Sequence, residues 1–326
     1  MKSDYIWMDG EFVPYADAKI HVGSHCLHYA SAVFEGIRAY ETKDGRTAIF
    51  RGREHNDRLF NSAHIYRMHE KGRVPEKIKK LAEQNGWKVE IAWTREEFFE
   101  FMKQTIKKNG FKSCYIRPVI YRGAGGLGVF PMMNDIQAFI MTWEWGEYLG
   151  KGALENGVDV EVASWARARP NTMPPMAKAA SNYMGGQLQK MEAVINGYME
   201  GIGLDANGLV SEGSGENVFL VKDGVIYTTP IAGSILGGIT RDTVIKLAKD
   251  KGYEIREESF PREMLYLADE LFFSGTAAEV TPIRSVDDIQ IGNGKRGPIT
   301  EELQKAYLAL VRGEIEDKWG FLDYID

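Results

Sequence analysis

The sequence predicts a two-domain protein of the α+β class. Its 326 residues exceed the usual size of a single domain. Strand-forming runs are joined by Asp-Gly, a dipeptide typical of tight hairpins, at residues 9–10, 44–45 and 223–224. Hairpins in both halves of the chain, with helix-like segments between them, favour α+β over a regularly alternating parallel sheet.

Composition narrows the class of protein further. Hydrophobic residues make up 44% of the chain and charged residues 26%, which is ordinary for a globular protein. The formal net charge of −6 argues against nucleic-acid binding, and no apolar run suggests a signal segment or a membrane span. Two cysteines, Cys26 and Cys114, are too few for a disulfide framework. We therefore expect a cytoplasmic protein without nucleic-acid or membrane partners.

Apolar spacing predicts the elements of the first half of the chain. Helices are expected over 53–66, near 76–85 and near 95–108, and strands over 113–123 and 136–145. The Gly-rich segment between these strands, GAGGLGVFP, lacks the strand–GxGxxG–helix arrangement of a dinucleotide site. We interpret it as a loop that could cover a site.

Three histidines near the N-terminus could suggest a metal site. His21, His25 and His28 would share one face of a helix, but Gly23 and Ser24 weaken that helix. No cysteine or carboxylate completes a ligand set, so we assign no metal and expect packed or loop histidines.

The segment GEYLGKGALENG (146–157) is the strongest linker candidate. It predicts a small N-terminal α/β domain over 1–146, an interdomain loop over 147–154 and a large C-terminal domain over 155–326. Within the second domain we expect a strand over 158–165 and a helix after Lys178. A helix within 234–252, a strand from 267 and a closing helix near the C-terminus follow.

Lys178 occupies an unusual position in the second half. Pro170, Pro174 and Pro175 prevent a regular element immediately before it, and small residues flank it. Partial burial would favour the neutral amine, which is the nucleophilic form of lysine. A solvated surface lysine is the commoner alternative, so the rest of the chain must decide.

Three other features of the second half could belong to the same site. Glu212 lies among glycines and serines between strand-like runs, in a solvated turn or in a cleft. The turn before Thr240 leads into a helix, and Ser274-Gly275-Thr276 follows an apolar strand, so both could offer N–H donors to an anion. An amine, a carboxylate and two anion sites suit pyridoxal 5′-phosphate, which needs a lysine, an acid for its ring nitrogen and donors for its phosphate.

The sequence that contains these features resembles the class IV, fold-type-IV pyridoxal-phosphate aminotransferases, most closely the bacterial branched-chain amino acid aminotransferases. The resemblance covers nearly the whole chain. It is carried by HYASAVFEGIRAY (28–40), REHNDRL (53–59), YIRP (115–118), PNT…AKAASNY (170–183), SEGSGEN (211–217), GGITRD (237–242) and SGTAAEVTP (274–282). Residues 71–97 depart from the family pattern in being longer.

The resemblance implies a fold with two domains and the cofactor site between them. It implies that Lys178 binds the cofactor covalently and is the catalytic residue, that Glu212 pairs with the ring nitrogen and that Tyr183 contacts the phenolic oxygen. The phosphate cup that it implies consists of Arg58, Ile239, Thr240, Gly275 and Thr276. For the substrate it implies an aromatic pocket and an α-carboxylate turn, made up of Tyr29 from a neighbouring subunit, Phe34, Gly36, Tyr115, Trp145, Tyr148, Thr276 and Ala277. Arg117 would accept the distal carboxylate of glutamate or 2-oxoglutarate.

The implied activity is a ping-pong transamination of leucine, isoleucine and valine with 2-oxoglutarate, as in branched-chain amino acid biosynthesis. Its products are 2-oxo acids and L-glutamate, and the implied assembly is a homodimer or a higher homo-oligomer. The YIRP motif favours L-branched-chain substrates. A D-amino acid or (R)-amine aminotransferase is the alternative, and an aminodeoxychorismate-type lyase or a cofactor-storing binding protein is less favoured.

Overall fold

The computed structural model describes residues 3–146 and 148–326. Residues 1, 2 and 147, which belong to the predicted N-terminal domain and interdomain loop, lie outside the described residues. The described chain forms two compact units. The first comprises residues 3–145, Ala177–Ser181 and Asp317–Asp326, and the second comprises the described residues of Gly146–Met176 and Asn182–Glu316.

The first unit is built on an antiparallel sheet of short and long strands, with strand order β17-β5-β4-β6-β7-β1-β2. Strand β3 pairs with β6 outside this order. Its strands are β1 (Tyr5–Met8), β2 (Glu11–Pro14), β3 (Ala32–Phe34), β4 (Ile37–Glu41), β5 (Thr47–Phe50), β6 (Cys114–Arg122), β7 (Ile136–Trp143) and β17 (Leu322–Tyr324). Its helices are α1 (His25–Tyr29), α2 (Gly52–Ile65), α3 (Glu76–Asn85) and α4 (Arg95–Asn109). The predicted helices and the two predicted long strands are therefore present, with ends shifted by one or two residues.

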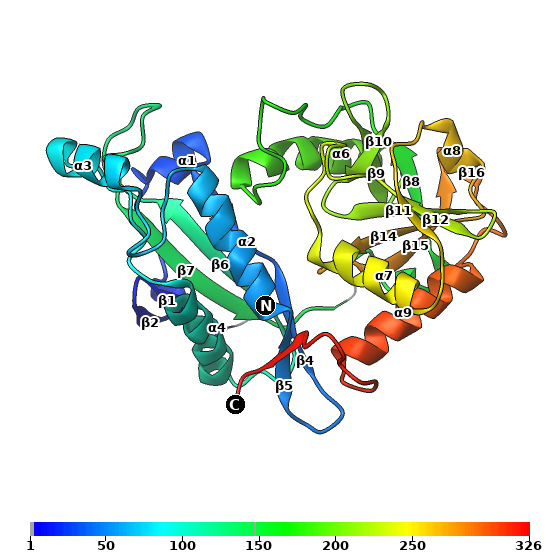
Figure 1. The fold of residues 1–326 in the computed structure, drawn as a ribbon, viewed down its shortest axis with the longest axis horizontal. Helices are drawn as coiled ribbons and strands as arrows, with labels where there is room; N and C mark the ends of the chain where they lie inside the picture. The colour runs from blue at the N-terminus through cyan, green and yellow to red at the C-terminus, as the bar shows by residue number, and fades with distance from the viewer. Residues whose placement is uncertain (1–2, 147) are drawn as a thin grey trace. The chain divides into compact units, whose positions relative to one another are not determined.

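Helix α4 shows how local sequence defines an element of this unit. Thr94 accepts a hydrogen bond from the N–H of Glu97, whose side chain accepts one from the N–H of Thr94, which together form a capping box. The helix ends at Gly110, whose φ of 70° favours glycine. Its apolar face is buried against the sheet, with α2 alongside it (Figure 1).

The three Asp-Gly turns are not alike. Asp9-Gly10 joins β1 to β2 and Asp223-Gly224 joins β11 (Asn217–Lys222) to β12 (Val225–Thr228), each as a two-residue loop with positive φ at both positions. The hairpin predicted at 44–45 also forms and has a turn hydrogen bond from the Gly45 N–H to the Thr42 carbonyl at 2.8 Å, but its loop is longer, because β4 ends at Glu41 and β5 begins at Thr47. Asp44 instead accepts hydrogen bonds from the side chain of Thr42 and from Arg46, which stabilise the wider loop.

The second unit has a sheet of strand order β10-β9-β8-β15-β14-β11-β12-β13, and β16 pairs with β15 outside this order. Its remaining strands are β8 (Val158–Val162), β9 (Glu200–Leu204), β10 (Val210–Gly213), β13 (Ile255–Glu257), β14 (Glu270–Gly275), β15 (Glu279–Val286) and β16 (Ile289–Gln290). Its helices are α5 (Ala153–Asn156), α6 (Tyr183–Ile195), α7 (Ile239–Asp250), α8 (Glu263–Tyr266) and α9 (Pro298–Val311). Helices α7 and α9 lie side by side on β14 and β15 (Figure 1), and α6 packs on β9.

The predicted domains differ from these units at Gly146 and at the described residues of the interdomain loop, which belong to the second unit, and in two further segments. Residues 177–181 and 317–326 were expected in the C-terminal domain, but both belong to the first unit. Ala179 forms a bridge to Val33 of β3, and β17 pairs with β5, so backbone hydrogen bonds attach both segments to the first sheet. No helix among the described residues is long and apolar enough to cross a membrane.

Candidate active site

The backbone of Lys178 is held on the first unit by a strand and a helix. The Phe34 N–H donates to the Lys178 carbonyl at 3.0 Å, and the Lys178 N–H donates to Ser62 Oγ of α2 at 2.9 Å. Ala177 and Ala179 on either side are buried. The Lys178 Nζ lies 5.0 Å from the centroid of the Phe34 ring. The lysine thus has a fixed backbone and an amine beside an aromatic face.

Arg58 of α2 is bound by a buried carboxylate. Its Nε donates to Glu35 Oε1 at 2.6 Å and its Nη2 donates to Glu35 Oε2 at 2.9 Å, while Glu35 is 0% exposed. Burial raises the pKa of Glu35, but the charges and hydrogen bonds of Arg58 and His55 together outweigh burial and hold that pKa well below its usual range. Burial lowers the pKa of His55, and its Nδ1 donates to Glu35 Oε2 at 2.7 Å.

An aromatic group of the first unit surrounds Arg117. The Tyr115 ring stacks on Trp145 with centroids 4.6 Å apart and lies 4.9 Å from the Trp143 ring. The Arg117 guanidinium carbon lies 4.8 Å from the Phe34 centroid, and Nη2 donates to Tyr115 Oη at 3.4 Å. Arg117 Nε is buried and has no hydrogen-bond partner within the described chain. An apolar wall with one half-buried cation can receive an aliphatic side chain or a carboxylate.

Gly36 makes room for this group. A Cβ atom at Gly36 would overlap the Tyr115 hydroxyl and would lie 2.9 Å from its Cζ atom. Only a residue without a side chain therefore lets the Tyr115 ring approach the strand as it does here.

Tyr29 ends α1 and is 45% exposed. It stacks on His25 with ring centroids 4.6 Å apart. His25 is buried, and its Nε2 donates to the Gly128 carbonyl at 2.7 Å while Nδ1 lies 2.7 Å from Ser31 Oγ. His25 therefore connects Tyr29 to the Gly-rich loop that the sequence placed over a site.

Glu212 lies on β10 of the second unit and is almost fully buried. It accepts hydrogen bonds from Arg167, from Asn217 Nδ2 at 3.1 Å and from the Leu236 N–H at 3.0 Å. These donors satisfy the negative charge of the carboxylate and fix its orientation. The prediction of a carboxylate in a solvated turn can thus be set aside for Glu212.

Asn217 connects Glu212 to the two predicted anion turns of the second unit. Its side chain donates to the Leu236 carbonyl at 3.0 Å, and its backbone pairs with Ser274 at the end of β14. A Cβ atom at Gly238, the residue before α7, would overlap Asn217 Oδ1. The residue before α7 therefore lies against the side-chain amide that donates to Glu212, and the end of β14 pairs with the backbone of the same asparagine.

The remaining predicted residues of the second unit lie on these elements or beside them. Ile239 and Thr240 are the first two residues of α7 and are buried. Gly275 ends β14, and Thr276 and Ala277 form the half-buried turn before β15. Tyr183 begins α6 and is half-buried, whereas Tyr148 lies on the exposed segment before α5.

The structure thus distributes the predicted site over both units. Lys178, Arg58 and the aromatic residues other than Tyr148 and Tyr183 belong to the first unit, and Glu212 with the two anion turns belongs to the second. Several residues that touch these side chains were not assigned by the sequence: Glu35, His55, Ser62, Arg167 and Asn217. Each of these residues lies within or near a block that carries the family resemblance. The residue to which it is hydrogen-bonded is distant in the sequence, from 5 positions for Asn217 and Glu212 to 116 positions for Ser62 and Lys178. Only the helical spacing of 55, 58 and 62 could have suggested a shared face of α2.

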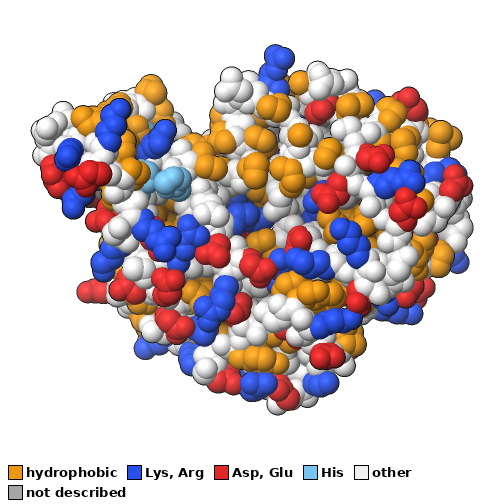
Figure 2. Space-filling model, in the orientation of Figure 1, with side chains coloured by type: hydrophobic (Ala, Val, Ile, Leu, Met, Phe, Trp, Pro, Cys, Tyr) orange, Lys and Arg blue, Asp and Glu red, His pale blue; other side chains and the backbone are white. Residues whose placement is uncertain are grey.

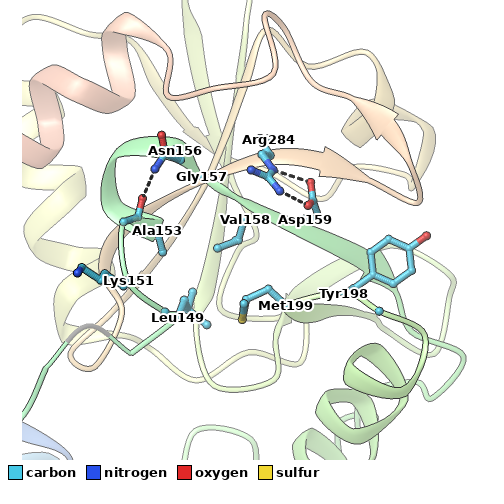
Figure 3. Close-up of a pocket in the computed structure, with 13 residues that line it drawn as sticks. Leu149, Lys151, Ala153, Asn156, Gly157, Val158, Asp159, Tyr198, Met199 and Arg284 are labelled. Carbon is cyan, nitrogen blue, oxygen red and sulfur yellow. Dashed lines mark hydrogen bonds and ion pairs between the residues drawn. The ribbon is translucent and has the colours of Figure 1, made fainter.

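A cavity of about 350 Å³ lies elsewhere on the second unit, between the segment before β8 and the turn after α6 (Figure 3). Leu149, Met199 and Tyr198 line it together with the Arg284–Asp159 ion pair, in which Nε donates to Oδ1 at 2.8 Å. The predicted site residues are absent from its described lining. It is separate from the side chains discussed above.

The three N-terminal histidines occupy loop and packed positions. His21 Nδ1 accepts from the Gly23 N–H at 3.0 Å, His28 Nε2 lies 2.9 Å from the Val22 carbonyl, and His25 is buried as described. Among residues 3–146 and 148–326, no cluster of three or more His, Cys, Asp or Glu side chains that could hold a metal ion was found.

On the face of the molecule seen in Figure 2, basic and acidic side chains are interspersed.

Comparison with known proteins identifies the class that this fold and site define. The family described as amino-transferase class IV matches residues 32–286, and the chain belongs to this family. The chain is 49% identical to the branched-chain-amino-acid aminotransferase of Escherichia coli (strain K12) over 326 residues, which cover 100% of this chain and 98% of that protein.

Solved structures agree with this assignment. The crystal structure of the Escherichia coli branched-chain amino acid aminotransferase is 49% identical and superimposes with a TM-score of 0.91, over 100% of both chains. That of the T.th. branched-chain amino acid aminotransferase complexed with N-(5′-phosphopyridoxyl)-L-glutamate is 44% identical with a TM-score of 0.89, again over 100% of both chains. The fold predicted from the sequence, that of a fold-type-IV aminotransferase, is confirmed, and the chain is similar over its whole length to branched-chain amino acid aminotransferases.

Enzymes of this class use pyridoxal 5′-phosphate. The donor set found here fits that cofactor. The first unit offers a lysine amine and a guanidinium, and the second offers a buried carboxylate held by three donors and the N-terminus of a twelve-residue helix.

Proposed function

We propose that this aminotransferase uses pyridoxal 5′-phosphate to transfer the amino group of L-leucine, L-isoleucine and L-valine to 2-oxoglutarate. The products are the branched 2-oxo acids and L-glutamate, and the physiological role is branched-chain amino acid biosynthesis. One observation carries the substrate proposal: the half-buried side chain of Arg117, whose Nε atom is buried, lies within an otherwise aromatic wall. The wall suits a branched aliphatic side chain, and Arg117 suits the distal carboxylate of glutamate.

Each candidate residue has a defined task in this proposal. Lys178 Nζ would bind the cofactor and move the proton of the substrate α-carbon. An amine can act both as the nucleophile that binds an aldehyde and as a general base. Glu212, oriented by Arg167 and Asn217, would pair with the ring nitrogen and favour its protonated form. Bound pyridoxal phosphate supplies the aldehyde that takes up the amino group and the electron-withdrawing ring.

The remaining contacts bind and orient. Arg58 and the buried first turn of α7, with Ile239 and Thr240, would bind the phosphate together with Gly275 and Thr276. The N–H groups of Thr276 and Ala277 would bind the substrate α-carboxylate. Tyr183 would donate to the phenolic oxygen.

The apolar substrate side chain would contact a set of residues that exclude water. These are Phe34, Gly36, Tyr115, Trp145 and Tyr148, with Tyr29 supplied by a neighbouring subunit.

We propose a homodimer or a higher homo-oligomer. Large apolar side chains are exposed on two described surfaces, the Gly-rich loop and one face of α6, and such patches support association. They are Leu127, Val129 and Phe130 on the loop, and Met184, Met191 and Ile195 on α6. Sedimentation of the purified protein tests this proposal, and a monomer at micromolar concentration would contradict it.

We also propose that the enzyme acts in the cytoplasm. Cys26 and Cys114 are both free thiols, and Cys114 is buried, which suits a reducing compartment.

A spectral titration of the cofactor-loaded protein tests the function. L-leucine, a D-amino acid and an (R)-amine are added separately, without an oxo acid. Loss of the visible cofactor band with L-leucine alone supports the proposal. Loss mainly with the D-amino acid or the amine would contradict the substrate assignment, and absence of any visible band would contradict the cofactor assignment.

A further inference from the structure

A buried polar group on the first unit has no role in the function proposed so far. It consists of Glu35, which accepts two hydrogen bonds from Arg58, and His55, which donates to Glu35. Glu35 follows β3 directly, and His55 and Arg58 lie three positions apart on α2 and so share one face of that helix. Glu35 is therefore the point at which the strand and the helix are connected by charge.

The Arg58–Glu35 pair has the geometry of a side-on fork. The Nε and Nη2 donors of Arg58 reach different oxygens of Glu35, at 2.6 and 2.9 Å. Two parallel charge-assisted hydrogen bonds fix the plane of the guanidinium, which a single contact cannot do. His55 Nδ1 and the Gly36 N–H also donate to Glu35 Oε2, at 2.7 and 3.3 Å, so the carboxylate itself cannot rotate without losing partners.

The same elements hold the backbone of Lys178. Phe34, the residue before Glu35, donates its N–H to the Lys178 carbonyl, and Ser62, one turn after Arg58 on α2, accepts the Lys178 N–H. The helical positions 55, 58 and 62 thus point to one side of α2, toward β3 and the lysine. The carboxylate that orients Arg58 therefore belongs to the same strand end that holds Lys178.

We propose that Glu35 is a positioning residue for the cofactor phosphate. It orients Arg58 as the phosphate-binding cation and keeps that cation at a fixed distance from Lys178, so that one cofactor can engage both. This inference rests on the proposed cofactor-binding roles of Arg58 and Lys178. It assigns Glu35 an effect on phosphate recognition and none on the chemistry at the lysine.

The test compares two aldehydes that differ only in the phosphate. Cofactor-free protein is titrated with pyridoxal 5′-phosphate and with pyridoxal, and the dissociation constants are read from the visible absorption that develops on binding. In Glu35→Gln, one charge-assisted contact to Arg58 is lost, so the preference for the phosphorylated aldehyde should fall by about tenfold to a hundredfold. The affinity for pyridoxal should stay within about threefold of the original.

Glu70→Gln is the matched control. Glu70 is also a buried carboxylate of the first unit and accepts from Arg95 Nε at 3.0 Å, while Arg95 Nη1 donates to Asp57 of α2 at 2.8 Å. The control therefore weakens a similar ion pair attached to a different face of α2. It should leave the preference for the phosphorylated aldehyde unchanged, because the ion pair that it weakens is that of Arg95 rather than that of Arg58.

The outcomes separate this inference from the proposed function. An unchanged preference in Glu35→Gln, or equal losses for both aldehydes, would overturn the positioning role. Failure of the unaltered protein to bind either aldehyde would overturn the cofactor assignment itself. If Glu35→Gln does not fold, Glu35→Asp, which keeps the charge but shortens the reach, is measured in the same way. A preference equal to that of the unaltered protein would then refute the proposal.

Discussion

Replacement of Arg117 by methionine should separate the reactions with the two proposed amino donors, glutamate and leucine. Methionine keeps an unbranched apolar stem among Phe34, Tyr115 and Trp143 but removes the guanidinium. The distal carboxylate of glutamate would then lose its cation, whereas leucine has no such carboxylate to lose. We expect a large loss of reaction with glutamate and little change with leucine.

The magnitude follows from the donors that Arg117 can present. Nε is buried without a partner in the described chain, and Nη2 makes only a long contact of 3.4 Å to Tyr115 Oη. Two hydrogen bonds to a carboxylate at about 1.5 kcal/mol each amount to about 3 kcal/mol. Since about 1.4 kcal/mol corresponds to a factor of ten, kcat/KM for glutamate should fall about 150-fold.

The assay is the rate at which each amino acid removes the visible cofactor band under single-turnover conditions. Arg53→Met is a suitable control, because Arg53 also lies over an aromatic ring, that of Phe99 at 5.1 Å, but on α2 and paired with Asp323. It should leave the glutamate-to-leucine ratio unchanged. Equal losses for both substrates in Arg117→Met would refute the reasoning and make Arg117 a structural residue.

Three further predictions concern the amine, the pocket and a buried acid. Lys178→Ala should abolish turnover and the visible band while circular dichroism stays native; cofactor trapped by borohydride on another lysine would disprove the assignment. Gly36→Ala should displace the Tyr115 ring and lower kcat/KM for leucine at least about tenfold, with glutamate and leucine measured side by side; an unchanged value would show that the ring adjusts freely. Burial raises the pKa of Glu216 to about 8, so the folded state binds a proton that the unfolded state loses above about pH 4.5, and stability should decrease from about pH 5 to pH 8. Urea unfolding at pH 6 and pH 9 should show that Glu216→Gln reduces this decrease by more than about 1.4 kcal/mol, the free energy of one pKa unit, and an identical decrease in both proteins would exclude Glu216 as its source.

Local signals predicted most of the secondary structure. Apolar spacing was sufficient for α2, α3 and α4, because each buries one face, and α3 and α4 end at recognisable residues, Gly86 and Gly110. The Asp-Gly dipeptide predicted all three hairpins but not the length of the loop around 44–45. That length depends on how far β4 and β5 stay paired, which is a property of the sheet rather than of the dipeptide.

The site was predictable only in part. The lysine, the acid and the anion turns have recognisable local settings, and the family resemblance named them by position. The partners of Arg58 were not predictable, because Glu35 is 23 positions away and meets α2 only when β3 packs on it. The same holds for the assignment of Lys178 to the first unit, which depends on the hydrogen bond between Phe34 and the lysine carbonyl.

The chain passes between its two units more than once, and this path determines whether a single proteolytic cleavage can separate them. The path leaves the first unit after Trp145, returns for Ala177–Ser181, leaves again and comes back for the last ten residues, Asp317–Asp326. Proteolytic nicking at the glycines of 150–152 would therefore not release either unit as an independent folded piece. The N-terminal fragment would lack strand β17 and the lysine segment, both of which remain on the C-terminal fragment. We therefore expect nicked protein to migrate as intact protein under native conditions and as two fragments only after denaturation.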